Sequence, residues 1–224
     1  KAIRPEEHLK DFGGTLHADA YAGYNNLYND GPNPEGKITE AACWAHTRRK
    51  FYEVTVTNPN ANIAMKTLEE ISQIYAVEED ISGLDPEARY KTRQERSKDL
   101  VEKLFTDWKK YYKELPKKSA TGAAIAYALN NEAALKRFLN DGKIEIDNNT
   151  AERAIRSIAL GRKNWLFAGS DGGGKTAAAI YTITETAKLN NINPWAYLRE
   201  VLARIQDHNS TKISELLPWN LKLP

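Results

Sequence analysis

The spacing of apolar residues predicts that the middle of the chain, residues 61–140, is entirely helical. Ile63, Leu68, Ile71 and Ile74 roughly keep the 3.6-residue period of a helix with one buried face. A second helix is predicted from Asp85-Pro86, because Asp is a good N-cap and Pro suits the first helical position. Two shorter helices are expected at 122–130 and 132–139.

The two flanking parts mix short strands with helices. Before the helical middle, strands are predicted at 15–18, ending at Asp19, and at 38–44, with helices at 21–28 and 45–55 and a Pro- and Gly-rich loop at 29–36. After it, the predicted elements are a strand at 143–146, a helix at 149–160, an extended segment at 164–168, helices at 176–189 and 194–207, and an apolar tail at 216–219 that docks on them. These patterns divide the chain into parts 1–60, 61–140, 141–170 and 171–224.

Charge changes sign within the helical middle. Residues 67–86 contain six acidic and no basic side chains, whereas residues 87–118 contain eleven basic and six acidic ones. An acidic helix followed by a basic one predicts an antiparallel hairpin with complementary faces. Solvated helix faces are the plainer interpretation of the same pattern.

Composition limits the classes of protein that the chain can belong to. The 224 residues suffice for a real core in one or two domains, and a net charge of +2 excludes a polycation, so any nucleic-acid site must be a local patch. The single cysteine, Cys43, excludes an internal disulfide, and no apolar run reaches the length of a membrane span.

A glycine-rich string, Gly169–Thr176, fits the phosphate-binding pattern GxxxxGK[ST]. A nucleotide-binding ATPase is therefore one alternative function. Against it, the residues that follow are predicted to be helices, with no further strand ending in a metal-binding Asp. A glycine-rich connection into a helix is the favoured interpretation, and no other nucleotide or cofactor motif is apparent.

Two carboxylates have positions from which they could share a metal ion. Asp19 ends a predicted strand, and Glu152 lies on the first turn of a predicted helix. Oxygen ligands of this kind suit Mg²⁺, and two such ions can activate water or a hydroxyl against a phosphodiester. Each residue also has a purely structural interpretation: Asp19 as the N-cap of helix 21–28, and Glu152 in a capping box with Asn149.

Basic side chains accompany both carboxylates. One group lies in the string 43–50 and the other around and after Glu152, close to Trp165 and Phe167; cations near aromatic residues suit a DNA backbone. A solvated basic face beside core aromatics is the alternative. The candidate DNA-binding residues are His46, Arg48, Arg49, Arg156, Arg162 and Lys163.

Three strings in a fixed order resemble a known family. They are His17–Asn25, Cys43–Phe51 and Asp147–Arg156, the last continuing through Leu160–Ser170. Together they resemble the DDE-type transposases of bacterial insertion sequence family 66. The resemblance implies an α/β, ribonuclease-H-like core: a mixed sheet flanked by helices, with a large all-helical insertion and a helical C-terminal tail.

The resemblance also implies a function. The family's triad of acids holds Mg²⁺ or Mn²⁺ for DNA strand cleavage and strand transfer at the ends of an insertion element, with Asp19 matching the second acid and Glu152 the third. DNA and further copies of the protein are the implied partners, in the bacterial cytoplasm.

The first acid of the triad is expected on a strand upstream of Gly13. Only Asp11 precedes Asp19 among the aspartates, and it lies beside the Gly13-Gly14 break. We therefore expect the opening strands to precede Lys1 and the chain alone not to cleave DNA. A catalytically inert remnant that binds DNA or the transposase's partners is the non-enzymatic alternative.

Overall fold

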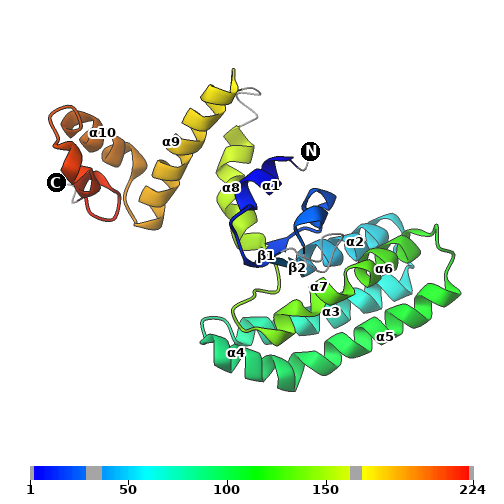
Figure 1. Cartoon of the computed structure of the whole chain (residues 1–224). Helices are drawn as coiled ribbons and strands as arrows, with labels where there is room; N and C mark the ends of the chain where they lie inside the picture. The colour runs from blue at the N-terminus through cyan, green and yellow to red at the C-terminus, as the bar shows by residue number, and fades with distance from the viewer. Residues whose placement is uncertain (1–2, 29–36, 162–167, 222–224) are drawn as a thin grey trace. The chain divides into compact units, whose positions relative to one another are not determined.

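The computed structural model describes residues 3–28, 37–161 and 168–221 and divides the chain into two compact units (Figure 1). Unit 1 comprises Lys1–Asn149 and unit 2 comprises Thr150–Pro224. Each unit is described by itself below. The predicted loop at 29–36 and most of the predicted extended segment at 164–168 lie outside the described residues.

Unit 1 contains a small parallel sheet. Strand β1 (Gly14–Ala18) pairs with β2 (Ile38–Ala42) in a register that places Gly14 opposite Ile38 and Ala18 opposite Ala42. The short helix α1 (Ile3–Leu9) precedes β1, and the 3₁₀ helix η1 (Ala22–Leu27) follows it. Both predicted strands are thus confirmed, and among the described residues the sheet has these two strands only.

Helices form the rest of unit 1, as the apolar spacing predicts. They are α2 (Trp44–Thr57), α3 (Asn62–Asp80), α4 (Pro86–Thr92), the π-helical turn η2 (Arg93–Ser97), α5 (Lys98–Glu114), α6 (Ala120–Asn130), α7 (Glu132–Lys136) and η3 (Arg137–Asn140). The Asp85 carboxylate caps α4 by accepting hydrogen bonds from the Glu87 and Ala88 amides at 3.0 Å. We call residues 62–140 the helical region.

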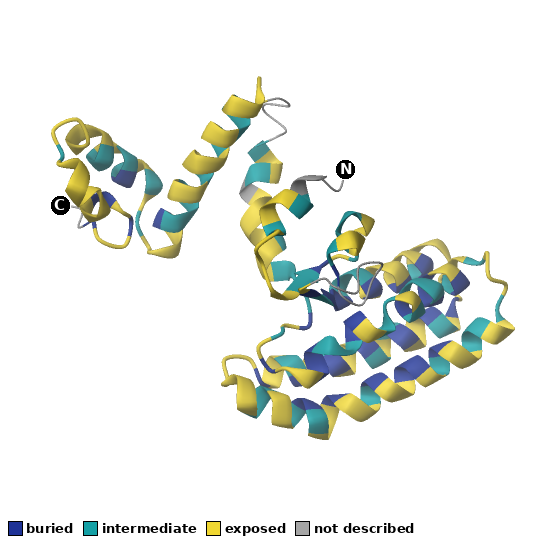
Figure 2. Cartoon of the chain, viewed as in Figure 1, coloured by how far each residue is buried: buried dark blue, intermediate teal, exposed yellow. Residues whose placement is uncertain are grey.

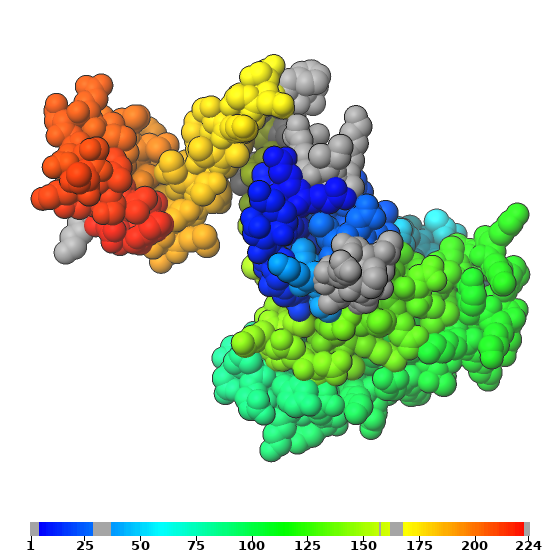
Figure 3. Space-filling view, in the orientation of Figure 1, coloured from blue at the N-terminus to red at the C-terminus, as the bar shows by residue number. Residues whose placement is uncertain are grey.

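An aromatic core holds α2 against the helical region. Trp44 and Phe51 point inward from the basic string, and Phe51 stacks on Trp108 with ring centroids 5.4 Å apart. The Trp44 indole donates a hydrogen bond to the Leu135 carbonyl at 2.8 Å, which satisfies its polar atom inside the core. Figure 2 shows the buried residues gathered on the inward faces of α2, α3, α5 and α6. In the space-filling view α4 to α7 (green) form one continuous surface (Figure 3).

Ion pairs join α3 to η2 and α5; the two from the acidic run, Glu70 and Asp80, agree with the change of charge, whereas Lys66 pairs in the opposite sense. Lys66 pairs with Asp107, Glu70 with Lys103, and Asp80 with Arg96, at 3.1, 3.0 and 2.7 Å. As the residue number increases along α3, from 66 to 80, that of the partner decreases from 107 to 96. The two helical stretches therefore run antiparallel.

The strand predicted at 143–146 is wrong, because the described backbone there is irregular. The fully buried guanidinium of Arg93 binds residues 138–144, which we call the return segment, donating to the carbonyls of Phe138, Asp141 and Ile144 at 2.8, 3.1 and 2.9 Å. The Lys143 and Ile144 amides both donate to Asp141, at 2.8 and 3.1 Å, and so are not available to a strand ladder. At the end of this segment, the Ile146 carbonyl accepts from the Trp44 amide, two residues after β2, at 3.1 Å.

Unit 2 consists of helices: α8 (Asn149–Gly161, whose first residue belongs to unit 1), α9 (Asp171–Leu189), α10 (Pro194–Arg204) and the 3₁₀ helix η4 (Ser210–Leu216). The apolar tail docks through Leu216, which is buried against Tyr197, whereas Trp219 stays 58% exposed. None of the helices among the described residues is both long and apolar enough to cross a membrane.

Helix α9 begins five residues before the predicted start at Thr176, so the glycine run is helical. Ser170 caps it, its hydroxyl accepting from the Gly173 amide at 3.0 Å and its carbonyl from the Gly174 amide at 2.9 Å. A Cβ at Gly173 would lie 2.0 Å from the Ala168 carbonyl oxygen. Steric fit therefore accounts for glycine at this position, and no phosphate ligand is needed to explain it.

Candidate active site at the carboxyl edge of the sheet

Asp19 lies directly after the last residue of β1, and its side chain is exposed. Within the described part of the chain, no hydrogen bond or ion pair involves its carboxylate. The next residue, Ala20, has a φ of 58°, a left-handed conformation that is rare for a residue with a Cβ. The sequence thus presents a carboxylate to solvent at a sharp turn of the backbone.

The register of the sheet brings a second chain segment to this place. Because Ala18 pairs with Ala42 in parallel, Asp19 and Cys43 leave their strands at the same edge. The Trp44 amide bonds the Ile146 carbonyl, and the Asn148 amide lies against the Cys43 thiol. We call the ends of β1 and β2, together with residues 146–149, the carboxyl edge; ligands of parallel sheets bind at such edges.

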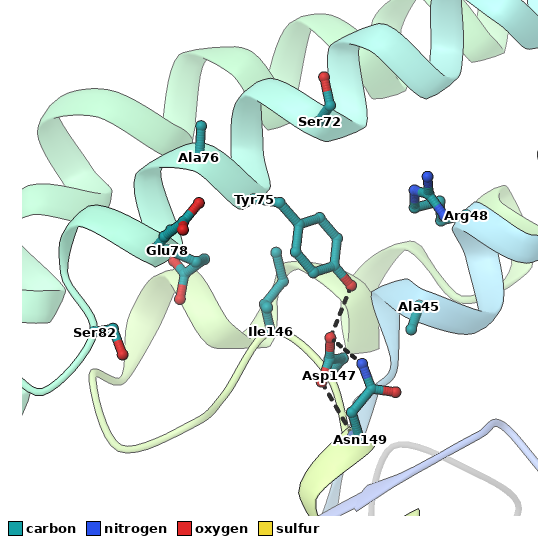
Figure 4. A pocket seen from close by; sticks show the side chains of 11 residues that line it. Ala45, Arg48, Ser72, Tyr75, Ala76, Glu78, Ser82, Ile146, Asp147 and Asn149 are labelled. Carbon is teal, nitrogen blue, oxygen red and sulfur yellow. Dashed lines mark hydrogen bonds between the residues drawn. The ribbon is translucent and has the colours of Figure 1, made fainter.

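A hydrogen-bonded turn at the carboxyl edge starts helix α8 (Figure 4). The Asp147 carboxylate accepts from the Asn149 amide at 3.0 Å, from the Asn149 side chain at 2.8 Å and from the Tyr75 hydroxyl at 3.0 Å. Tyr75 belongs to α3, so the helical region holds the segment from which α8 begins. Glu152 lies in the first turn of α8 and is half-buried.

A pocket of about 660 Å³ lies beside this turn in unit 1. Tyr75, Asp147 and Asn149 line it, with the exposed Arg48 of α2 on the other side of the Tyr75 ring (Figure 4). Burial and the neighbouring Asp147 charge raise the pKa of Tyr75 well above its usual range. The Tyr75 hydroxyl therefore stays protonated and keeps donating to Asp147.

Burial keeps two other titratable groups of the carboxyl edge neutral. It lowers the pKa of His17 from its ordinary value of 6.5, against the opposing effects of the Ala42 backbone and of Asp147 and Glu145. It raises the pKa of the buried Cys43 thiol. At neutral pH, neither a histidinium nor a thiolate is therefore favoured beside the carboxylates.

The contact between Asp19 and Tyr127 has no counterpart among the features predicted from the sequence. The Tyr127 hydroxyl donates to the backbone carbonyl of Asp19 at 3.4 Å, across 108 residues of chain. Tyr127 and Lys50 also line a groove of about 480 Å³ between α6 and α2. Nothing in the local pattern around a half-buried tyrosine indicates its long-range partner, so only the fold reveals this contact.

The predicted site residues fall in both units. Asp19, His46, Arg48 and Arg49 belong to unit 1, where the two arginines are exposed and His46 is half-buried. Glu152 and the exposed Arg156 belong to unit 2, so the structure describes them apart from Asp19. Arg162 and Lys163 lie outside the described residues.

The structure does not itself assemble a metal centre. Among the described residues, no three His, Cys, Asp or Glu side chains are close enough to one another to hold a metal ion. Asp19 and Glu152 remain candidates by position and donor type: an exposed carboxylate at a strand end, and another one turn into a helix that begins at the same edge.

The nucleotide-binding alternative loses its structural basis. In a phosphate-binding loop the backbone amides are open to the ligand, whereas the Gly173 and Gly174 amides are bonded to Ser170 and Thr176 lies within α9.

Comparison with known proteins agrees with these features. The model of the family described as "Transposase IS66 family" matches residues 1–176, and that of the "IS66 C-terminal element" matches residues 182–219. The chain therefore belongs to the IS66 family of transposases.

Curated relatives come from Sinorhizobium fredii (strain NBRC 101917 / NGR234) and carry the names of uncharacterized proteins. The chain is 41% identical to y4qI over 220 residues, covering 96% of the chain and 40% of y4qI. It is 39% identical to y4hP over 229 residues, covering 97% of the chain and 41% of y4hP. The chain thus spans about 40% of the length of these relatives, and no solved structure matches it significantly.

Proposed function

We propose that this chain contributes two of the metal-binding carboxylates of a transposase that cleaves DNA and joins it to a target. The observation that carries the proposal is the carboxyl edge: Asp19 leaves β1 where residues 146–149 pass β2 and lead into α8. Glu152 follows one helical turn later. In a ribonuclease-H-like core, acids from a strand end and from a helix would meet at this place.

Asp19 and Glu152 would hold Mg²⁺ or Mn²⁺. Both are oxygen donors, which hard cations prefer, and Asp19 is an exposed acceptor with its carboxylate uncommitted among the described residues. Ions bound in such sites lower the pKa of the attacking water or hydroxyl and stabilise the leaving oxygen of a phosphodiester. The remaining acid of the triad would come from the strand that the family resemblance implies before Gly13.

The basic residues would hold the DNA backbone. Arg48, Arg49 and Lys50 form an exposed run on α2, which begins at the carboxyl edge, and Arg156 is exposed on α8 one turn beyond Glu152. Arginine and lysine at such positions neutralise phosphates and make binding depend steeply on salt. By their charge, Arg162 and Lys163 would add to this surface, and by the resemblance two or more copies would assemble on the DNA.

The direct test is nicking of DNA that carries the ends of the element, in Mg²⁺ or Mn²⁺, by the transposase as its gene encodes it. We expect Asp19→Asn and Glu152→Gln each to reduce nicking to background, because each removes a charged metal ligand while keeping the side chain's size. Glu87→Gln, which changes an exposed carboxylate of α4, is the matched control and should nick normally.

Binding separates this proposal from the inert-remnant alternative. Both carboxylate variants should still bind end DNA in a gel shift, with the salt dependence of phosphate contacts. Full nicking by Asp19→Asn would contradict the proposed role of the carboxylate. Unchanged DNA binding without nicking by any form, wild type included, would favour a DNA-binding remnant.

A further inference from the structure

Tyr127 connects the helical region to the candidate metal ligand. It lies on α6, half-buried, and its hydroxyl donates to the Asp19 carbonyl at 3.4 Å. The ammonium of Lys50 lies 5.7 Å from the centre of the Tyr127 ring, on the other side of the groove. The ring is thereby fixed between α6 and α2, and its hydroxyl can hold the end of β1.

The hydrogen-bonded carbonyl belongs to the peptide that joins Asp19 to Ala20. Ala20 is left-handed, with a φ of 58°. A residue with a Cβ adopts this conformation only where its surroundings enforce it, and such strain concentrates at functional sites. A hydrogen bond to the preceding carbonyl fixes the plane of this peptide and so resists relaxation of Ala20 to an ordinary conformation.

The neighbouring strand is held from the same helical region in a comparable way. The Arg137 side chain of η3 donates to the Glu40 carbonyl of β2 at 3.2 Å. Each strand thus has a backbone carbonyl, at or next to its end, that accepts a hydrogen bond from the helical region: Asp19 from Tyr127 and Glu40 from Arg137.

We propose that Tyr127 is a positioning residue for Asp19: its hydroxyl holds the Asp19–Ala20 peptide so that the carboxylate points to the metal site. This inference rests on the proposed function, because it takes Asp19 to be a metal ligand. In this proposal the helical region provides no metal ligand itself, but its residue Tyr127 orients the Asp19 carboxylate.

The test measures nicking of end DNA by the transposase as its gene encodes it, over a range of Mn²⁺ concentrations. Tyr127→Phe keeps the ring and its contact with Lys50 but removes the hydroxyl. Groups that orient metal ligands contribute about tenfold or more to metal affinity. Because the bond here is long, we expect the Mn²⁺ concentration for half-maximal nicking to rise on the order of tenfold, with the KM for DNA unchanged. Tyr52→Phe, at an exposed tyrosine of α2, is the control and should leave both constants unchanged.

A role in folding alone would give a different result. Partial unfolding of Tyr127→Phe would lower the maximal rate and leave the half-maximal Mn²⁺ concentration where it is in the wild type; that result would overturn the inference. The carbonyl ¹³C resonance of Asp19 supplies an independent readout and should move in Tyr127→Phe and not in Tyr52→Phe. An unmoved resonance would overturn the inference as well.

The Asp19→Asn variant distinguishes failure of the proposed function from failure of the positioning role alone. If Asp19→Asn nicks with the wild-type dependence on Mn²⁺, Asp19 is no metal ligand and both proposals fall. If Asp19→Asn is inactive and Tyr127→Phe matches the wild type in all constants, only the positioning role falls.

Discussion

Ala20 is the residue at which the backbone of the candidate site is strained. Its left-handed conformation costs an alanine roughly 1–2 kcal/mol, whereas glycine adopts it freely. Asp19 therefore precedes a residue, Ala20, whose backbone conformation is unfavourable for alanine.

Replacing Ala20 by glycine should relieve this strain. After subtracting the greater backbone entropy of glycine in the unfolded chain, we expect Ala20→Gly to raise the free energy of unfolding by roughly 0.5 kcal/mol. Ala76→Gly, at an exposed position of α3, is the matched control and should lower it by about 1 kcal/mol. Urea unfolding measures both, and an equal loss in the two variants would refute the strain at Ala20.

His17 makes the stability of unit 1 depend on pH. Burial lowers its pKa below the ordinary 6.5, so the unfolded chain binds a proton at a pH where the folded chain does not. The stability due to the neutral imidazole is therefore complete above about pH 7 and is lost as pH falls below the unfolded pKa.

The variant His17→Gln isolates this effect. Between about pH 7.5 and pH 5.5, the free energy of unfolding of the wild type should fall by up to about 1 kcal/mol more than that of His17→Gln. The other histidines are common to both proteins and cancel in the comparison. Equal falls in the two proteins would show that the His17 pKa is not lowered by folding.

At the scale of elements, Arg93 ties the helical region to the segment that leads into α8. Its guanidinium is fully buried, binds both Glu78 carboxylate oxygens at 2.8 and 2.6 Å, and donates to three carbonyls of the return segment. Removing Arg93 would leave the Glu78 carboxylate with the longer contact to Arg89, at 3.7 Å, and the three carbonyls without this donor.

Two arginines three residues apart allow a direct comparison. Arg93→Ala should lower the free energy of unfolding by about 3–5 kcal/mol. Arg96→Ala removes the exposed pair with Asp80, whose side chains are 49% and 57% exposed, and should cost less than about 1 kcal/mol. Calorimetric or denaturant unfolding gives both values, and similar losses would contradict the anchoring role of Arg93.

Local patterns predicted most of the elements. Apolar spacing located the helices of the helical region, Asp85-Pro86 marked the start of α4, and the change of charge predicted the pairing of α3 with α5. Each of these features depends on neighbours along one helix or on two faces of opposite charge. The short strand predicted at 15–18, just before Asp19, agrees with β1.

The errors arise where distant residues decide the conformation. The residues at 143–146 have the composition of a strand, but Arg93, some fifty residues earlier in the chain, binds the Ile144 carbonyl, and the Lys143 and Ile144 amides bond Asp141. The start of α9 was placed too late because three glycines favour a loop, whereas the Ser170 cap extends the helix through them. The contacts of Tyr75 with Asp147 and of Tyr127 with Asp19 have no local signature.

At the scale of the whole molecule, the candidate carboxylates belong to different units. Asp19 lies in unit 1 and Glu152 at the beginning of unit 2, three residues after the last residue of unit 1, Asn149. The proposed function therefore requires that one divalent ion bind both carboxylates. We propose that it would do so at the carboxyl edge, where Tyr75 and Tyr127 make their contacts with Asp147 and Asp19.

The most direct test is a titration of the chain with Mn²⁺ followed by paramagnetic broadening of backbone amide resonances. We expect the signals of Asp19 and Glu152 to broaden together at the lowest Mn²⁺ concentrations, and Asp19→Asn to abolish the broadening at both. Broadening at one carboxylate alone, or first at the acidic residues 78–80 of α3, would contradict the claim that Asp19 and Glu152 share a metal ion.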